Sequence, residues 1–310
     1  MKKWFKWIIV LFVLILAVIY IFIPGEIELT ESVLVDANPK GTNRCLAKEE
    51  NWQKLLGSET IIQKNSFKYK GINFKIEKNL YEGIPVTITG NNLSTVSILD
   101  CLPAGFDSTA ITWRATVETG MNPISKVQQY FKVRQLENSM SSLLLKMKLF
   151  TEKESNVYGI EIELKQVTDT FLVATKAYLN NYPSDTTIYD MIKALQKYIP
   201  AKNLKAVNPP MLNVRATENS PYETMVAIPI DRGIDDDGRI LFKRMVPGKI
   251  LITKVKGGKQ TIKNTFDIVE QYVQDHGYLA PAISFESLIT DRSKEADTAQ
   301  WLTKVCYPIY

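Results

Sequence analysis

The feature that most constrains this chain is a seven-residue pattern, T-x-V-x-x-P-I, that occurs twice in its second half. The two copies span 224–230 and 303–309, an offset of 79 positions (303 minus 224). Each copy ends a segment with the same order: an apolar strand, an amphipathic helix and two further strands. The sequence therefore predicts an internal duplication of a β-α-β-β unit, with repeats at about 167–230 and 249–310.

The helix of each repeat is marked by its apolar spacing. Apolar residues form one helical stripe across 188–199 and another across 262–273. Ser184 or Asp185 is placed to cap the first helix, and Pro200 is placed to end it. Because three strands and one helix cannot cover both faces of a sheet, we expect the two repeats to share a core about a pseudo-twofold axis. A cleft between their helices is then the expected ligand site.

Three motifs accompany the duplication: K-V-K-G-G at 254–258, F-E-S-L-I-T-D at 285–291 and W-L-T-K-V-C-Y-P-I at 301–309. With them, the segment from about 167 to 310 resembles the gyrase-inhibitor-like family, the effector-binding domain of multidrug-responsive bacterial transcription activators. The resemblance implies that the glutamate of the F-E motif, Glu286 here, lies in the cleft and pairs with cationic ligands.

Strand alternation by itself leaves the role of Glu286 open. Alternation places Glu286 on one face with Ser284 and Leu288. A strand glutamate more often faces solvent, so it is the resemblance that favours the cleft. The comparable strand of the first repeat carries Asn213. Only one repeat is thus expected to contribute a charge.

Aromatic side chains near such a cleft would stack on a flat or cationic ligand. The candidates are Tyr178, Trp301 and Tyr307, the last because it lies in the repeated final strand. Core packing is the alternative role for each. The predicted ligand-binding set is Glu286, Tyr307, Trp301 and Tyr178.

The N-terminus reads as a membrane segment. Lys2, Lys3 and Lys6 precede an uninterrupted apolar run over 7–23, about long enough to cross most of a bilayer at about 1.5 Å per residue. A cleavable signal peptide has the same order, but no small-x-small site follows, so an uncleaved anchor over 1–24 is favoured. The lysines predict a single-pass protein of the bacterial inner membrane, with a cytoplasmic N-terminus and the remainder outside the cytoplasm.

The region 25–155 shows another order of elements. An alternating strand near 28–35 and a helical stretch at 52–56 precede a β region, and a long helix begins at Asn122 and Pro123. The strand candidates are 67–69, 72–76, 85–89, 95–99 and 109–117. This order resembles the START-like, polyketide-cyclase-like (SRPBCC) superfamily, a helix-grip fold whose long helix closes a curved sheet over an apolar cavity. The fold class is α+β, with domains at 25–155 and 156–310.

Composition and motifs exclude several functions. The net charge of +5 is mild, the lysines are scattered, and no helix-turn-helix precedes the effector-like domain, so nucleic-acid binding is disfavoured. The D-D-D-G run at 235–238 suggests a calcium loop, but Gly233 and Arg244 occupy its first and twelfth ligand positions. The single histidine, His276, fits a helix end, and no zinc site can be assembled from it. No metal or cofactor is predicted.

The cysteines leave two alternatives. Cys45 and Cys101 could form a disulfide outside the cytoplasm, or remain buried free thiols together with Cys306.

The leading functional prediction is non-catalytic, membrane-anchored binding of an amphipathic small molecule, which the resemblance suggests is cationic. A second possibility is a small-molecule hydrolase that uses Glu286 as a general base beside the Tyr307 hydroxyl. A third is a membrane scaffold whose cavities are filled by side chains.

Overall fold

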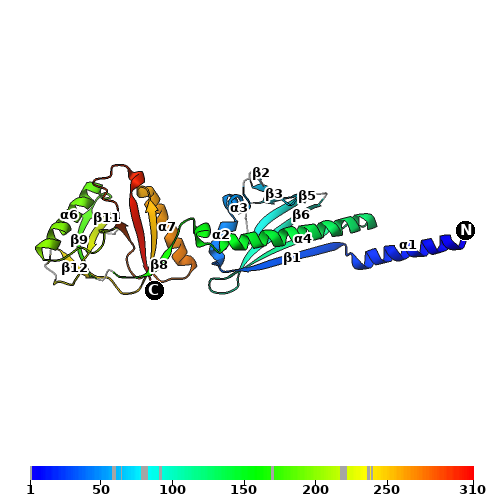
Figure 1. Ribbon diagram of the computed structural model, residues 1–310, viewed down its shortest axis with the longest axis horizontal. Helices are drawn as coiled ribbons and strands as arrows, with labels where there is room; N and C mark the ends of the chain where they lie inside the picture. The colour runs from blue at the N-terminus through cyan, green and yellow to red at the C-terminus, as the bar shows by residue number, and fades with distance from the viewer. Residues whose placement is uncertain are drawn as a thin grey trace. The chain divides into compact units, whose positions relative to one another are not determined.

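The computed structural model describes the chain except residues 1, 58–60, 64, 78–82, 91–92, 169–170, 217–221, 236–237 and 239. The described chain divides into two compact units, unit 1 over 1–159 and unit 2 over 160–310 (Figure 1). Each unit has its own antiparallel sheet. The boundary predicted at 155 falls within α5 (Glu154–Tyr158), the short helix that ends unit 1.

The chain begins with a helix, α1 (Lys2–Phe22), that is long and apolar enough to cross a membrane. Its 19-residue apolar stretch would span about 28 Å, close to the thickness of a bilayer core. At its C-terminal end, the Lys126 ammonium donates to the Ile23 carbonyl at 2.8 Å, and the Tyr20 hydroxyl donates to the Met121 carbonyl. These contacts join the end of the apolar helix to the first turn of α4.

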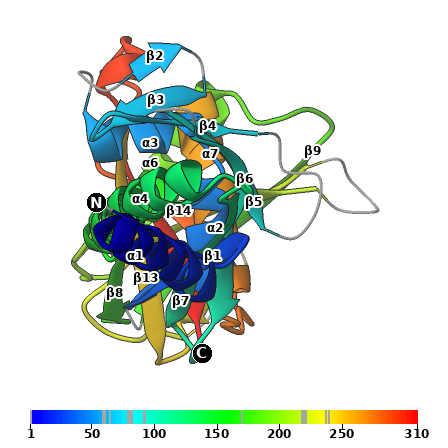
Figure 2. The same cartoon turned by 90° about the vertical axis from the view of Figure 1, so that its right-hand side faces the viewer.

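Unit 1 combines a seven-stranded sheet, in the order β1-β7-β6-β5-β4-β3-β2, with one long helix. Its strands are β1 (Glu26–Val35), β2 (Ile61–Gln63), β3 (Ser66–Tyr69), β4 (Ile72–Ile76), β5 (Ile84–Gly90), β6 (Leu93–Pro103) and β7 (Thr109–Glu118), and its further helices are α2 (Pro39–Leu46), α3 (Glu49–Leu56) and α4 (Pro123–Thr151). Figure 2, which looks roughly along α4, shows the strands curling around that helix. The Asn122 side chain accepts the Ile124 amide at 2.9 Å and so caps α4, as the Asn-Pro pair predicts.

The space between α4 and the sheet is packed with large side chains. Four aromatic rings, those of Trp52, Phe67, Phe74 and Trp113, follow one another with centroid separations of 5.0–6.4 Å. The Trp113 indole N–H donates to the Ser97 hydroxyl at 2.9 Å, so this polar group is satisfied in the core. Aromatic rings thus occupy a region where the START-like resemblance led us to expect an apolar cavity.

Cys45 and Cys101 are free thiols. Burial raises the pKa of Cys45 to about 11 and that of Cys101 to about 12. Both are therefore protonated and weakly nucleophilic at neutral pH.

Unit 2 is built on an eight-stranded sheet in the order β12-β9-β11-β10-β14-β15-β13-β8. Its strands are β8 (Glu163–Gln166), β9 (Phe171–Leu179), β10 (Met211–Arg215), β11 (Tyr222–Pro229), β12 (Leu241–Arg244), β13 (Lys249–Lys256), β14 (Phe285–Leu288) and β15 (Leu302–Ile309), and its helices are α6 (Asp185–Ala201), α7 (Lys259–Asp275) and the short 3-10 helix η2 (Thr298–Gln300). Both α6 and α7 fall where the apolar stripes predict helices. The two edge strands β8 and β12 have no clear period-2 apolar pattern and were not predicted.

Two groups of elements in unit 2 follow one order, β9-α6-β10-β11 and β13-α7-β14-β15. In each group the last strand lies between the other two, and β10 pairs with β14 at the centre of the sheet. Helix α6 packs on β9 and β11, and α7 packs on β13 and β15. Both helices lie on one face of the sheet, which we call the helix face. The opposite face is called the inner face below.

The sheet of unit 2 must curl, because a short connector joins two distant strands. Residues 245–248 link β12 to β13, which are separated by five strands in the sheet. A flat sheet would place them about 29 Å apart at about 4.8 Å per strand, whereas five peptide steps span at most about 18 Å. Met245 of the connector packs on the inner face with Met211 and Phe285. The sheet therefore curves around the inner face.

Candidate functional site

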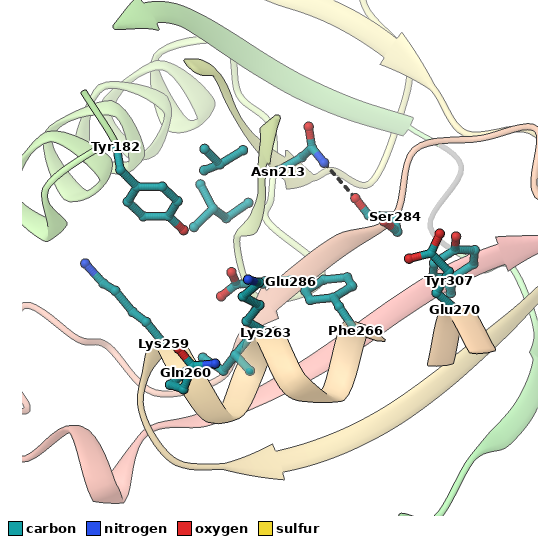
Figure 3. Close-up of a pocket in the computed structure, with 13 residues that line it drawn as sticks. Tyr182, Asn213, Lys259, Gln260, Lys263, Phe266, Glu270, Ser284, Glu286 and Tyr307 are labelled. Carbon is teal, nitrogen blue, oxygen red and sulfur yellow. Dashed lines mark hydrogen bonds between the residues drawn. The ribbon is translucent and has the colours of Figure 1, made fainter. Parts of the chain in front are cut away.

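A cavity of about 680 Å³ opens on the helix face, between α7 and the central strands β10, β14 and β15 (Figure 3). Its lining residues come from the segment before α6, from β10, β14 and β15 with the residue before β14, and from one side of α7. They are Tyr182, Leu212, Asn213, Val214, Lys259, Gln260, Ile262, Lys263, Phe266, Glu270, Ser284, Glu286 and Tyr307. The volume lies within the usual range of small-molecule sites, about 300–1,000 Å³.

Glu286 lies on the floor of this cavity and is held by an arginine. In β14, Phe285 faces the inner core and Leu288 faces the core beneath α6, so alternation turns Glu286 toward the helix face. The Arg292 guanidinium donates to Glu286 Oε2 at 2.6 Å. The side chains of Glu286 and Arg292 are 12% and 4% exposed. A well-aligned partner of this kind offsets the cost of burying either charge.

Arg292 is itself fixed by several contacts. Its guanidinium donates to the Thr303 hydroxyl at 2.9 Å and lies 4.7 Å from the Trp301 ring centre. Its backbone N–H donates to the Tyr189 hydroxyl at 2.6 Å, and that hydroxyl donates to the Thr290 carbonyl at 3.2 Å. These contacts fix the segment that follows β14, and with it the orientation of the Glu286 carboxylate.

One oxygen of Glu286 stays open. Oε2 binds Arg292, and within the described part of the chain Oε1 accepts no hydrogen bond. Because the residue lines the cavity, Oε1 can accept a hydrogen bond from a molecule that enters it. The site thus offers a pre-oriented acceptor whose negative charge is already balanced by an internal cation.

Two tyrosines supply hydroxyl groups to the cavity wall. Burial raises the pKa of Tyr182, and the negative charge of Glu286 raises it further. Burial also raises the pKa of Tyr307, with a smaller contribution from Glu270. Both hydroxyls therefore stay neutral at physiological pH, when each can donate one hydrogen bond. In Figure 3 the Tyr182 hydroxyl points into the cavity and the Phe266 ring lies beside Glu286.

A cation lies at the rim near Tyr182. The Lys259 ammonium pairs with Asp185 at 3.2 Å and stands 5.6 Å from the Tyr182 ring centre.

The floor of the cavity is shaped by a hydrogen bond that β10 makes. The Asn213 amide donates to the Ser284 carbonyl at 2.8 Å, the bond drawn in Figure 3. This bond ties the middle of β10 to the residue before β14 and so shapes the floor of the cavity.

The structure brings together two of the four predicted site residues. Glu286 and Tyr307 both line the cavity. Trp301 is buried against Arg292 and supports it from behind. Tyr178 is 65% exposed, and its register opposite Glu223 places it on the inner face, so it does not share a cavity with Glu286.

Sequence reasoning missed Arg292, the residue that holds Glu286. Arg292 directly follows the F-E-S-L-I-T-D motif. No local pattern shows that the chain turns after β14 so that this side chain contacts Glu286 of the same strand. Tyr182, Phe266 and Glu270 were missed as well. Phe266 is visible in the stripe of the second helix, where a core role is the ordinary interpretation.

The structure places part of the D-D-D-G run and the single histidine. Within the described residues, no group of three or more His, Cys, Asp or Glu side chains could hold a metal ion. Asp236 and Asp237 of the D-D-D-G run lie outside the described residues. His276 is buried after α7, where its ring lies 4.0 Å from Tyr272 and its Nδ1 is 2.8 Å from the Tyr272 carbonyl.

No family model and no curated protein matches this chain. Solved structures resemble about half of it. The C-terminal domain of EcmrR is 17% identical, with 49% of this chain and 98% of that chain covered at a TM-score of 0.41. A hydrolase from Listeria innocua is 9% identical, with 52% and 98% covered at 0.37.

SAV2435 bound to tetraphenylphosphonium is 13% identical, with 49% of this chain and 94% of that chain covered at a TM-score of 0.35. At TM-scores below 0.5, these likenesses assign neither a family nor a function to this chain.

Proposed function

We propose that unit 2 binds an amphipathic small molecule, without catalysis, in the cavity on its helix face. The observation that carries the proposal is the Glu286 carboxylate: it lies in a cavity of about 680 Å³, is oriented through one oxygen by Arg292, and leaves the other oxygen open. A carboxylate in this state prefers a ligand that donates a hydrogen bond. Phe266, Tyr182 and Tyr307 offer aromatic surface to the rest of that ligand.

Arg292 changes the charge preference expected from the sequence. A bare buried carboxylate would need a cationic ligand as its partner. Here the Arg292 guanidinium already supplies the positive charge at 2.6 Å. A ligand ammonium would therefore gain a charge-assisted hydrogen bond but little net compensation of charge. We propose an amphipathic amine or ammonium with a flat apolar body, bound through its N–H group.

The two groups of elements in unit 2 support a duplicated architecture. Leu212 of β10 stands opposite Val226 of β11, and Glu286 of β14 stands opposite Val305 of β15. Val226 and Val305 are 79 positions apart (305 minus 226), the offset of the repeated motif. Leu212 and Glu286 also face each other across β10 and β14. In this alignment the counterpart of Glu286 is Leu212, one position before Asn213. The duplicated fold would then carry its carboxylate in one half only.

The remaining parts of the proposal concern unit 1 and the membrane. We propose that α1 is an uncleaved anchor, and that unit 1 is a helix-grip, START-like domain whose core is filled by aromatic rings. The lysines at the N-terminus favour placement of both units outside the cytoplasm. Protease added to intact spheroplasts should then digest the region after Pro24; protection of both units would reverse the orientation.

The binding proposal is tested by titrating the full-length protein, in a non-ionic detergent, with three aromatic probes. One probe is a fluorescent primary amine, and the second is its N-acetyl, N-methyl derivative, which has no hydrogen-bond donor. The third is tetraphenylphosphonium, a cation without an N–H group, whose binding is measured by displacement of a fluorescent probe. Glu286→Gln should weaken the amine about tenfold and leave the neutral, donor-free probe within about twofold. Tetraphenylphosphonium should weaken by less than the amine, because it meets the uncompensated Arg292 charge but loses no hydrogen bond.

Asp267→Asn, an exposed carboxylate-to-amide change on α7, is the matched control and should bind every probe as wild type does. Equal amine affinity in wild type and Glu286→Gln would remove Glu286 from the site. Turnover of an ester probe that disappears in Glu286→Gln would replace binding by hydrolysis.

A further inference from the structure

The inner face of unit 2 holds two cavities of its own. One has a volume of about 360 Å³ and the other about 220 Å³. Met211, Met245 and Phe285 line both of them, so the two cavities adjoin and form one groove inside the curled sheet. The groove lies on the opposite side of the sheet from Glu286.

The larger part of the groove is mainly apolar. Its walls come from β9, β10, β11, β12, β15, the connector and the segment leading into β14, and their apolar side chains include Met211, Met225, Met245 and Phe285. Val246 and Ile283 are 55% and 44% exposed at its mouth. Methionine side chains adapt their shape readily, which suits a flexible apolar chain better than a rigid ring system.

The smaller part of the groove is positively charged. Lys254 and Lys304 stand directly opposite each other on β13 and β15, and both line this cavity with Lys165. Like charges in directly opposed positions destabilise a sheet. Lys165 pairs with Glu163 at 2.5 Å, and the Glu163 carboxylate also attracts Lys254 and Lys304 from beyond ion-pair distance. Among the described residues, these three lysines thus share one carboxylate. An anion placed between the Lys254 and Lys304 ammonium groups would remove the repulsion.

The far end of the groove differs, because one of its cations is already neutralised. Lys176 pairs there with Glu223 at 2.6 Å. Lys243 and Arg244, on the edge strand β12, also line this end and are exposed, but Leu172 and Phe171 stand opposite them, so no like charges are opposed there. Among the described residues of the groove, only Lys254 and Lys304 are like charges that stand directly opposite each other.

We propose that the inner-face groove binds an anionic amphiphile with one apolar chain, of the fatty-acid type. Its carboxylate lies between Lys254 and Lys304, and its chain runs past Met211 and Met245 toward Met225. The charge of the pair selects the head group, and the adaptable methionine side chains suit an unbranched chain. This site is separate from the cavity of Glu286 and takes a ligand of the opposite charge.

Photolabelling with a palmitic acid that carries a diazirine in its chain tests the proposal. The full-length protein is held in nanodiscs of neutral phosphatidylcholine, irradiated with the probe, digested and mapped by mass spectrometry. Label is expected on β11 and on the 245–248 connector, and palmitate should compete for it. Hexadecanol and hexadecyltrimethylammonium should not. Label on α1, acquired from the bilayer, serves as the internal standard.

The variant Lys254→Gln with Lys304→Gln should lower groove labelling about tenfold relative to α1, since two charge-assisted contacts are lost. The charge-keeping variant Lys254→Arg with Lys304→Arg should retain it. Lys243→Gln, at the other end of the groove, and Glu286→Gln, on the other face, should label as wild type does.

Three results would overturn the proposal: groove labelling unchanged in the double glutamine variant, equal competition by the cationic amphiphile, or label confined to α1. Loss of the groove label in nanodiscs that contain phosphatidylglycerol would also overturn it, because the lysines would then bind a membrane lipid head group in place of a free acid.

Discussion

Unit 2 buries two strand glutamates next to arginines, and they differ in what remains open. Glu223 on β11 uses both oxygens, with Oε1 accepting from Lys176 at 2.6 Å and Oε2 accepting from Arg215 at 2.5 Å. Glu286 on β14 uses one oxygen, on Arg292, and leaves the other facing a cavity. Both oxygens of Glu223 are thus occupied by cations of the protein, whereas one oxygen of Glu286 remains available to a ligand.

The difference teaches that burial and pairing of a carboxylate do not by themselves mark a binding site. Glu223 is the more fully buried of the two, yet its cations saturate it. Glu286 has a single cation that is held from behind by Trp301 and Thr303. What distinguishes the site is an acceptor that is oriented and still has capacity. A carboxylate that only stabilises the fold and one that can also bind a ligand should therefore respond differently to substitution.

The largest effect is expected from Arg292→Gln. The change leaves the Glu286 carboxylate without its cation and removes the contact with the Trp301 ring. Loss of one partner of a buried pair costs about 3–5 kcal/mol. Because water in the open cavity can solvate Glu286, we expect a loss of about 3 kcal/mol. Hydrogen exchange of unit-2 peptides across a urea series measures it apart from unit 1.

Arg232→Gln is the control for Arg292→Gln. Its side chain is 56% exposed and pairs with Asp231 at 3.5 Å, so about 1 kcal/mol or less should be lost. If Arg292→Gln proved as stable as wild type, the open and closed carboxylates would not differ in the way described.

A second prediction separates the two glutamates by function. Glu223→Gln should cost unit 2 about 2 kcal/mol, less than a fully buried pair because Lys176 and Arg215 are 30% and 51% exposed and can rehydrate. Amine binding in the helix-face cavity should stay unchanged. Glu286→Gln should also cost about 2 kcal/mol, because the glutamine oxygen can still accept from Arg292 but the charge that balances this 4%-exposed cation is gone. It alone should lower amine affinity about tenfold. Parallel urea and binding titrations check both, and matching profiles would contradict the distinction.

The third prediction concerns acid. Hydrogen bonds from Lys176 and then Arg215 lower the pKa of Glu223 below its ordinary value of 4.5. Because the folded-state pKa is the lower one, this contribution is fully present above about 4.5 and is lost as the pH falls through the folded value. Between about pH 5 and pH 3, wild-type unit 2 should therefore lose more stability than Glu223→Gln does. Equal slopes of unfolding free energy against pH would show that Glu223 is not the group responsible.

The smallest effect is expected from Trp301→Phe. The ring that faces Arg292 is kept, whereas the indole N–H that donates to the Glu295 carbonyl at 3.0 Å is lost. One such hydrogen bond contributes about 1 kcal/mol. Amine affinity should change by less than about twofold, because Arg292 keeps its place. Trp301→Leu, which removes the ring, should weaken the amine further; equal affinity in both variants would mean that the ring does not orient Arg292.

Sequence patterns predict the elements of this chain where the signal is local. The two apolar stripes of α6 and α7 and the Asn-Pro start of α4 correspond to helices in the structure. The Ser184 cap is also present, since its hydroxyl accepts the Thr187 amide at 3.1 Å. Pro200 stands one residue inside α6, which ends at Ala201, so the proline acts at the last turn.

The candidate site was predictable only in part, since register and loop closure bring its residues together. Glu286 and Tyr307 could be named from strand motifs, whereas Arg292 reaches Glu286 through a turn that no periodicity encodes. Tyr178 was placed near the cleft because aromatic residues suit one. The alternation of β9, fixed by the pairing of Tyr178 with Glu223, turns it to the other face.

The four-residue connector at 245–248 sets the curvature of unit 2 by chain length. Side chains that line the inner face can be exchanged for others of similar size without flattening the sheet, because β12 and β13 remain tethered within about 18 Å. Insertion of flexible residues at exposed Pro247 would relax this tether and let the two halves of the sheet spread. The number of residues in the connector therefore limits how wide the groove can be. Insertions or deletions there would change this width without changing the side chains on either face of the sheet.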